Sequence, residues 1–574
     1  MALLIVLAAV LSIALSRVHM PALIGFILAG VVIANFFSLS ADFMEVVEVF
    51  SNIGLIMLMF AIGMEIDIRK IKENGVFAIT VAAVQLPLMV IGGAAGGMLL
   101  GFTFLQSIAL GCIISGSSTA VVLAVLKAQG TLKKEHIEML VLITIMEDIG
   151  QVVMLSMLTP VLQGNELDGQ SLMMLILNIA VFMGLCFVVG LRVVPRFIDW
   201  IAGRVSDELI SILCVGLAFA LAFMANMMGL SVAVGAFLMG VMIASTVKKD
   251  IVEHFVEPLR IMFMAMFFIS VGMEVTISGL TDNIVLILII FMLFAILKTV
   301  TVFIGYWIGN AEPRNGFVSA TALCAMGEFA FIIAKQALDT NVFDDALYSS
   351  VIGAALVSMF LLPITTRYTG RLWDGMEART PMRIRNWCAR RNAARSDFYA
   401  VMESLPGKGR KIFNTSIGWV YICIVMIFVI EIVFYYAYPP ASWWLKENYG
   451  DVGRYWDLLL MSINFWLLFL PCRVLVAKAR NIFYAYAVGR MVESRDKVEV
   501  AVERVRFYEA INPLLAAVAL DIFIIIVFPT ESDSIYAVIN FIIGLAAVIL
   551  IRYYRIKKGT ARIAPLPSLE DDTE

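Results

Sequence analysis

The sequence contains few charged residues. Lys and Arg number 42 and Asp and Glu 45 among 574 residues, so that charged side chains make up 15% of the chain, against about 25% in average soluble proteins. Hydrophobic residues make up 61%, whereas a soluble hydrophobic core stops growing beyond roughly 250 to 300 residues. This apolar surplus cannot be buried in water-soluble domains. The composition therefore excludes a soluble globular enzyme and predicts that lipid surrounds most of the chain.

Histidine is scarce, and cysteine lacks regular spacing. The three histidines, His19, His136 and His254, are too far apart in the sequence to predict a metal site. None of the seven cysteines belongs to a Cys-x-x-Cys pair, and six lie in or beside apolar stretches, which favours small buried hydrophobic residues over a disulfide framework. A net charge of −3 gives no basis for binding nucleic acid. No cofactor is expected.

Long apolar runs dominate the first 370 residues. Runs of about 17 to 25 residues, long enough to cross a bilayer as helices, are centred near residues 9, 29, 57, 88, 116, 149, 183, 217, 239, 265, 296, 327 and 357. The first run, 2–16, lacks a basic leader, so we interpret it as a membrane helix rather than a signal peptide. Lys and Arg occur in alternate connections. Because these residues favour the cytoplasmic side, we expect thirteen spans in a cell membrane, with the N-terminus outside.

The composition changes beyond the thirteenth run. Residues 1–370 are expected to form the transmembrane domain, and 371–414 form a basic connector on the cytoplasmic side. Residues 415–560 contain four further apolar runs, near residues 426, 465, 521 and 544, and read as an additional membrane module. Within this module, 491–510 has apolar residues at helical spacing, typical of either an amphipathic cytoplasmic helix or a solvated linker helix. The acidic tail, 561–574, is expected to be disordered, with a cytoplasmic C-terminus.

The transmembrane part contains an internal repeat. Residues 25–34 read GFILAGVVIA and residues 235–244 read GAFLMGVMIA, with six identities in ten at an offset of 210. A second matching pair, FAIGMEI from Phe60 and ISVGMEV from Ile269, has an offset of 209. The matched spans are seven apart by our count, and seven is odd, so the second copy is inverted in the membrane. Inverted repeats are typical of secondary transporters, whose sites lie where paired broken helices meet.

The same offset relates two interruptions of apolar runs. Residues 115–119 read SGSST within the fifth span, and residues 324–328 read CAMGE within the twelfth. Unwound backbone is tolerated in a membrane where it lines a cavity or where hydroxyl groups satisfy it. We therefore predict two broken helices, with Ser115, Gly116 and Ser117 in one break and Ala325 and Gly327 in the other. Each segment by itself is also compatible with a small-residue helix contact.

Few ionisable residues lie away from the predicted helix ends. Each costs about 2.5 to 3.5 kcal/mol at the centre of a membrane, which favours retention for a function. Burial and neighbouring acids both favour the protonated form of a carboxyl, and a carboxyl that binds a proton or a cation in turn makes an exchanger. The residues concerned are Glu147, Asp148, Lys298, Glu328 and Lys335.

The adjacent acids Glu147 and Asp148 are expected to serve different purposes. Neighbouring residues on a helix point about 100° apart, so one acid can face a cavity while the other pairs with Lys298. A purely structural ion pair, with Glu328 neutralising a helix dipole, is the alternative for this set. Lys335 is interpreted as an interfacial lysine that extends toward water, and the two Glu residues of the GME repeats, Glu65 and Glu274, as interfacial.

These motifs together resemble the cation:proton antiporter superfamily, in particular the branch that contains Kef-type potassium efflux antiporters and sodium/proton antiporters. The resemblance covers about residues 1–370 and lies in GSSTA at 116–120, the Glu147–Asp148 pair, FISVGM at 268–273, Lys298, and GEFAF at 327–331. The sequence departs from it at the acid pair, where the family usually has Gln-Asp or Asp-Asp. It also lacks the strand and GxGxxG of a nucleotide-binding domain after residue 370.

The resemblance implies a fold and a set of roles. Asp148 corresponds to the residue that alternately binds a monovalent cation and a proton, with Ser118, Thr119 and backbone carbonyls of the breaks assisting. Glu147 is then the partner of Lys298, and Glu328 a charge-compensating residue. The first to third and eighth to tenth helices form a scaffold and dimer part, while the others form a moving core. A homodimer is implied.

We therefore expect an all-α integral membrane antiporter, not an enzyme, that exchanges sodium or potassium for protons by alternating access. A channel-like potassium efflux system and a non-transporting membrane ion sensor are the alternatives. The first would differ by uncoupled cation flux and the second by binding without turnover.

Overall fold

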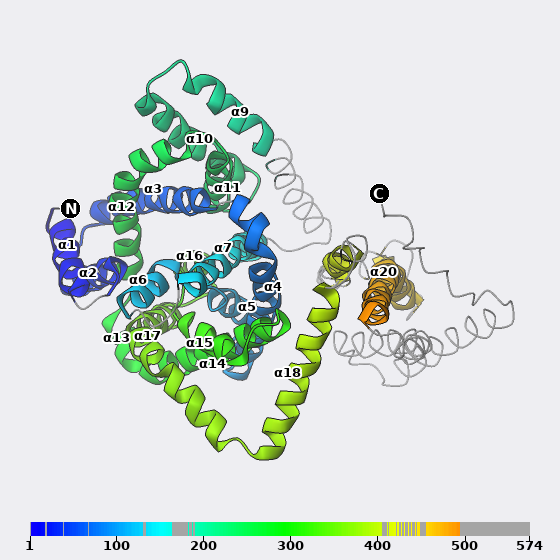
Figure 1. Ribbon diagram of the computed structural model, residues 1–574. Coiled ribbons are helices and arrows are strands. Elements are labelled where there is room, and N and C mark those ends of the chain that lie inside the picture. The colour runs from blue at the N-terminus through cyan, green and yellow to red at the C-terminus, as the bar shows by residue number, and fades with distance from the viewer. Residues whose placement is uncertain are drawn as a thin grey trace. The chain divides into compact units, whose positions relative to one another are not determined.

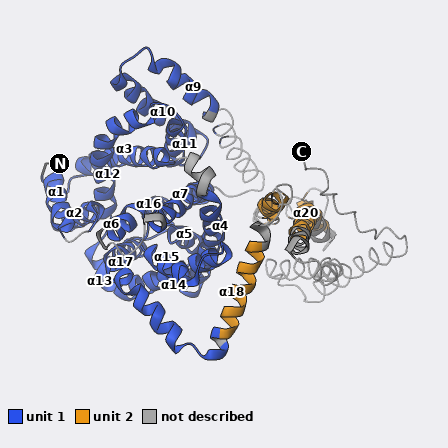
Figure 2. Cartoon of the chain, in the orientation of Figure 1, with its two compact units in different colours: residues 1–167, 173–385 blue, residues 168–172, 386–574 orange. Residues whose placement is uncertain are grey.

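The computed structural model describes residues 2–17, 20–37, 39–66, 68–129, 134–162, 190–403 and 455–493, together with single residues at 182 and 186 and scattered ones between 410 and 447. Over these residues the secondary structure is helical, with one isolated β-bridge and no strand. The chain divides into two compact units, residues 1–167 with 173–385 and residues 168–172 with 386–574 (Figure 2). The all-α fold class is thus confirmed for the described part.

The first unit contains the helices that carry the predicted site. They are α1 (Ala2–Ser16), α2 (Ala22–Phe36), α3 (Ala41–Glu65), α4 (Ile68–Leu99), α5 (Phe104–Ile113), α6 (Thr119–Gln129), α7 (Lys134–Leu162), α9 (Leu191–Ala202), α10 (Asp207–Met227), α11 (Val232–Ala244), α12 (Lys249–Met273), α13 (Ile277–Asp282), α14 (Ile284–Ile308), α15 (Pro313–Ala322), α16 (Glu328–Asp339) and α17 (Asp345–Arg379).

Seven of the described helices are long and apolar enough to cross a membrane: α3, the part of α4 from Gly75, the part of α7 from His136, α10, α12, α14 and α17. Shorter apolar helices of 10 to 17 residues are the part of α1 from Leu3, α2, α5 and α11. The expected seventh span, near residue 183, lies almost entirely outside the described residues.

Two groups of helices pack within the first unit (Figure 1). In the scaffold group, α3 packs against α11 and α12, α2 against α1 and α12, and α10 against α11. In the core group, α4 packs against α5, α7 and α14, while α17 packs against α14, α15 and α16. We name the groups after the scaffold and core that the family resemblance implies, and these two roles stay a prediction.

The inverted repeat is expressed as two equivalent helix crossings. Gly30 on α2 lies against the backbone of Ile269 and Gly272 on α12, and Gly240 on α11 lies against the backbone of Phe60 and Gly63 on α3. A Cβ atom at any of these glycines would overlap a carbonyl oxygen of the other helix. The glycines matched by the repeat are therefore the ones that let backbones approach closely.

The second unit is described only in part. It contains most of α18 (Met382–Glu403), which begins just before the boundary between the units, and α20 (Tyr455–Glu493). The predicted connector 371–414 is thus helical over most of its length. Of the predicted amphipathic helix 491–510, only residues 491–493 are described, as the end of α20. The predicted runs near 521 and 544 and the acidic tail lie outside the described residues.

Most of the cysteines are buried, as expected from the apolar stretches in which they lie. Cys112, Cys186, Cys214, Cys324 and Cys423 are buried, Cys472 is half-buried and Cys388 is exposed.

Candidate functional site

Two broken helices cross at the centre of the core group. Helix α5 ends at Ile113 and α6 begins at Thr119, while α15 ends at Ala322 and α16 begins at Glu328. The two interruptions pair across the crossing in an antiparallel β-bridge between Ser117 and Met326. The Ser118 backbone N–H donates to the Ala325 carbonyl at 2.9 Å, and the Gly327 N–H donates to the Gly116 carbonyl at 3.3 Å. The helices are thus interrupted at both of these segments, and each interruption satisfies backbone groups of the other.

The serines of the first break replace the lost helical hydrogen bonds. Ser115 Oγ donates to the Cys112 carbonyl at 2.7 Å, and Ser117 Oγ donates to the Leu323 carbonyl at 2.9 Å. Ser118 Oγ accepts from the Val121 N–H at the start of α6 at 3.4 Å. Short hydroxyl side chains compete with helical backbone bonding in this way, which explains why the chain unwinds here.

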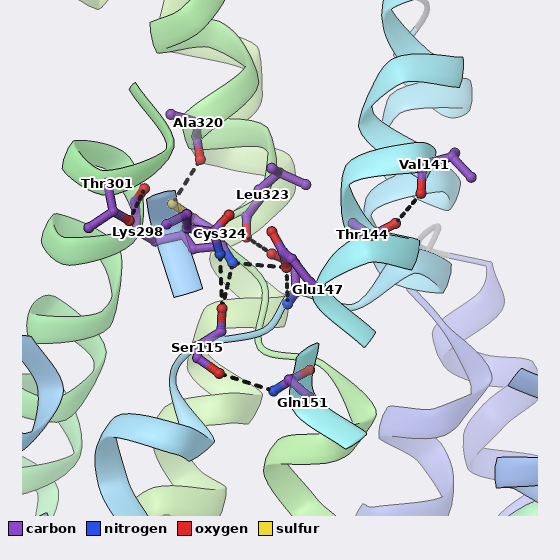
Figure 3. Close-up of polar contacts among 12 residues, drawn as sticks. Ser115, Val141, Thr144, Glu147, Gln151, Lys298, Thr301, Ala320, Leu323 and Cys324 are labelled. Carbon is purple, nitrogen blue, oxygen red and sulfur yellow. Dashed lines mark hydrogen bonds and ion pairs between the residues drawn. The ribbon is translucent and has the colours of Figure 1, made fainter. Parts of the chain in front are cut away.

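Lys298 on α14 and Glu147 on α7 form a fully buried ion pair (Figure 3). Lys298 Nζ lies 2.9 Å from Glu147 Oε2, and both side chains are 0% exposed. Lys298 also donates to the Ser115 carbonyl at 2.9 Å, and Glu147 Oε2 accepts from the Ser117 N–H at 2.8 Å. The pair therefore fastens the first break to two neighbouring helices and is the pairing implied by the family resemblance.

The structure adds residues that the sequence analysis did not single out. Gln85 on α4, fully buried, donates to the Ser115 carbonyl at 3.0 Å, and Ser358 on α17 accepts from the Met326 N–H at 3.0 Å. Gln151, one turn beyond Glu147 on α7, donates to Ser115 Oγ at 3.5 Å (Figure 3). Its side chain also fills the space beside Gly116 where a Cβ atom would lie. Gln85 and Gln151 could have been noticed in the sequence as polar amides inside apolar runs. An amide by itself, however, does not indicate which helix it contacts.

Asp148 has a different environment from its neighbour Glu147. Its side chain is half-buried, and among the described residues its carboxylate has neither an ion pair nor a hydrogen bond. It interacts electrostatically with three other acids, Glu328, Glu147 and Glu65, and with Lys298. A carboxyl that is partly accessible and surrounded by negative charge is suited to bind a cation or a proton.

Ser118, Thr119 and Glu328 lie at the starts of two half-helices. Thr119 is the first residue of α6 and is half-buried, and Glu328 is the first residue of α16. Ser118 Oγ donates to Glu328 Oε1 at 3.2 Å, which joins the two helix starts. A carboxylate at a helix N-terminus is stabilised by the helix dipole, in agreement with the compensating role expected for Glu328.

A cavity of about 360 Å³ lies between the end of α3 and the first half of α12. It is lined by Ala61, Met64, Glu65, Asp250, Glu253, His254, Val256, Glu257 and Arg260. Arg260 bridges Glu65 at 3.2 Å and Glu257 at 2.7 Å. Glu65 also interacts electrostatically with Glu328 at the start of α16. Among the described residues, no group of three or more His, Cys, Asp or Glu side chains has an arrangement that could hold a metal ion.

Lys335 differs from the interpretation as a lysine that extends toward water. Its side chain is 14% exposed, and Nζ lies 3.5 Å from Glu274 Oε1 and 3.6 Å from Asp339 Oδ1. Position 335 lies two turns beyond Glu328 on α16, where Lys335 contacts Glu274, the residue that follows α12. Sequence position alone could not reveal this partner, because Glu274 is 61 residues away.

The chemistry of the crossing is that of an ion site formed by oxygen atoms. Unwound backbone carbonyls and carboxylates are groups with which transporters bind small cations near the membrane centre. The buried Lys298 compensates Glu147 and a carbonyl oxygen of the first break, whereas Asp148 has no ion-pair partner among the described residues.

Comparisons with known proteins agree with this geometry. The chain is 26% identical over 355 residues to the Na(+)/H(+)-K(+) antiporter GerN of Bacillus cereus, covering 62% of this chain and 91% of that protein. It is 28% identical over 365 residues to K(+) efflux antiporter 5 of Arabidopsis thaliana, covering 63% of this chain and 64% of that protein.

A solved structure shares the fold. The sodium proton antiporter MjNhaP1 of Methanocaldococcus jannaschii superimposes with a TM-score of 0.54 at 16% identity, over 65% of this chain and 96% of that one. The model of the family described as sodium/hydrogen exchanger, transmembrane, matches residues 3–371, which include both broken helices, the buried ion pair and Asp148. The chain therefore belongs to the transmembrane sodium/hydrogen exchanger family.

Proposed function

We propose that this protein is a secondary antiporter that exchanges a monovalent cation, sodium or potassium, for protons by alternating access. The observation that carries the proposal is the contrast between two adjacent acids. Glu147 is fully buried and paired with Lys298, whereas Asp148 is half-buried and has no ion-pair partner among the described residues. Only a carboxylate without a fixed partner can exchange a proton for a cation at little cost.

In this proposal Asp148 binds the cation and the proton in turn. Ser118, Thr119 and carbonyl oxygens of the two breaks complete the cation's shell, while Lys298 pairs with Glu147. The cation and the proton each neutralise the same carboxylate, that of Asp148, so the two ligands compete for one group. Such competition couples opposite fluxes, because the site can change sides only when it is occupied.

The proposed architecture extends beyond the described helices. We infer thirteen spans over residues 1–370, with the N-terminus outside the cell, followed by the connector 371–414, a membrane module at 415–560 and the tail 561–574. The protein is proposed to be a homodimer through the scaffold group, with a core group that moves against it. Both broken helices belong to the core group, so its movement would carry the site with it.

Cation-dependent proton release in everted membrane vesicles tests the function. Respiring vesicles that contain the protein acidify their interior, and added Na+ or K+ should dissipate this gradient. Asp148→Asn should abolish the effect, because an amide neither titrates nor provides a full negative charge to the cation. Asp148→Glu should retain part of it.

The control is Asp282→Asn, the same change at an exposed aspartate at the end of α13. This variant should exchange ions like the parent chain. Full proton release by Asp148→Asn would overturn the assignment of Asp148. Cation flux without proton movement would indicate a channel, and cation binding without turnover in liposomes would indicate a sensor.

A further inference from the structure

A charged pair joins the core and scaffold groups on the side of the crossing away from the cavity. The cavity lies along the first half of α12, between Asp250 and Arg260, whereas Glu274 follows directly after the last residue of that helix. At about 1.5 Å per residue, the two ends of α12 are separated by more than 30 Å. Glu274 is paired there with Lys335 on α16, and the two side chains are 36% and 14% exposed.

The same side contains further contacts between the two groups. Phe331 on α16 packs edge-to-face against Phe268 on α12, with ring centroids 5.6 Å apart. Tyr348 on α17 donates its hydroxyl to the Val271 carbonyl on α12 at 3.0 Å. The ion pair therefore lies beside an apolar contact that closes the core against the scaffold.

One face of α16 connects this pair to the crossing. Glu328, Phe331 and Lys335 are spaced by three and four residues, so they lie on one stripe of the helix. Glu328 accepts a hydrogen bond from Ser118 at the crossing, while Lys335 reaches Glu274. Since a helix moves as a rigid rod, displacement of the crossing relative to α12 must separate Lys335 from Glu274.

The two copies of the inverted repeat differ at the positions of the Glu274–Lys335 ion pair. Glu274 corresponds to Glu65 in the two GME motifs, at an offset of 209. Glu65 faces the cavity and pairs with Arg260, a residue of its own scaffold group. The position equivalent to Lys335 at the same offset is Leu126, a buried apolar residue. The repeat thus provides a cross-group ion pair at Glu274 without a counterpart at Glu65.

We propose that Glu274 and Lys335 form the gate that holds the route on the Glu274 side closed, and that this ion pair must break before the site opens there. The inference rests on the proposed exchange function and assigns it two further residues. In the proposed orientation this side is the outside of the cell.

Accessibility of a cysteine beneath the gate tests the proposal. Ser270 is 5% exposed and lies four residues before Glu274, on the same face of α12. In the full chain with Ser270→Cys, a membrane-impermeant maleimide is applied from the Glu274 side. Glu274→Gln or Lys335→Gln should each accelerate labelling by about fivefold, as expected for losing a partly exposed ion pair. The chain without the introduced cysteine gives the background.

Two matched variants separate the gate from local damage. Asp339→Asn removes the other carboxylate beside Lys335, on the same helix, and should leave labelling at the parent rate. The exchange Glu274→Lys with Lys335→Glu should restore slow labelling, because it rebuilds the pair with reversed polarity. If neither Glu274→Gln nor Lys335→Gln accelerates labelling in vesicles that still exchange cations for protons, the proposed gate is overturned. Absence of exchange in the parent chain would instead contradict the proposed function.

Discussion

Two neighbouring residues with the same charge have opposite environments in this protein. Glu147 is fully buried and its Oε2 interacts with both Lys298 Nζ and the Ser117 N–H. Asp148, rotated by about 100° on the same helix, is half-buried among acids. One carboxylate thus serves the structure, and the other is free to bind a ligand in the proposed function.

Removing one partner of the buried pair should destabilise the protein more than removing both. Lys298→Met leaves the Glu147 carboxylate buried without compensation, a change that costs about 3 to 5 kcal/mol in comparable pairs. Adding Glu147→Gln should recover much of the loss, because no buried charge remains. Thermal unfolding of the purified variants in detergent measures this difference. A double variant no more stable than Lys298→Met would contradict the interpretation.

At the scale of the helices, the two copies of the repeat pack against each other. The crossing of α2 with α12 and that of α3 with α11 each bring together one helix from either copy, through glycines matched in the sequence. The broken helices follow the same rule, because α5–α6 and α15–α16 satisfy each other's backbone across the crossing. Neither copy of the repeat is therefore complete without the other.

A single methyl group should disturb these crossings. Gly240→Ala places a Cβ against the Phe60 carbonyl on α3, and overpacking of this kind typically costs about 1 to 3 kcal/mol. Gly216→Ala is the matched control, because this glycine lies within α10 with no neighbour within 4 Å of an added Cβ. The control should be neutral or slightly stabilising, since Ala favours helix. Equal melting temperatures for the two variants would contradict a close crossing at Gly240.

At the scale of the whole molecule, the proposed exchanger coincides with one unit. The family match ends at residue 371, and the first unit ends at residue 385. Both helix groups, both breaks and the Glu274–Lys335 pair lie within it. The C-terminal part, with α20, contributes none of the residues assigned to the site.

The chain shortened to residues 1–385 should therefore exchange cations for protons. We expect its KM for the cation to equal that of the full chain, because every proposed ligand is retained. Vesicle assays normalised to the amount of inserted protein measure this. If the shortened chain inserts and folds but does not exchange, the C-terminal part is required for transport.

Much of the fold could be predicted because long apolar runs in a sequence indicate membrane helices directly. Apolar length indicates helices, and matching sequence segments at an offset of 209 to 210 indicate an inverted repeat. The breaks at Ser115 and Gly327 were predictable for the same reason, since local polarity interrupts an apolar run. The connector was less predictable, because basic composition is compatible with the helices α17 and α18 that occupy it as well as with a loop.

The sequence by itself determined which residues are costly in a membrane, and so which few residues belong to the candidate site. Residue spacing left open which acid pairs with Lys298, although the family resemblance implied Glu147, and the tertiary structure decided how these residues pair. Lys298 meets Glu147 across 151 residues, and Lys335 meets Glu274 instead of extending toward water. Such pairings depend on the rotation of each helix about its axis. That rotation is set by packing against helices distant in sequence, which composition and periodicity do not encode.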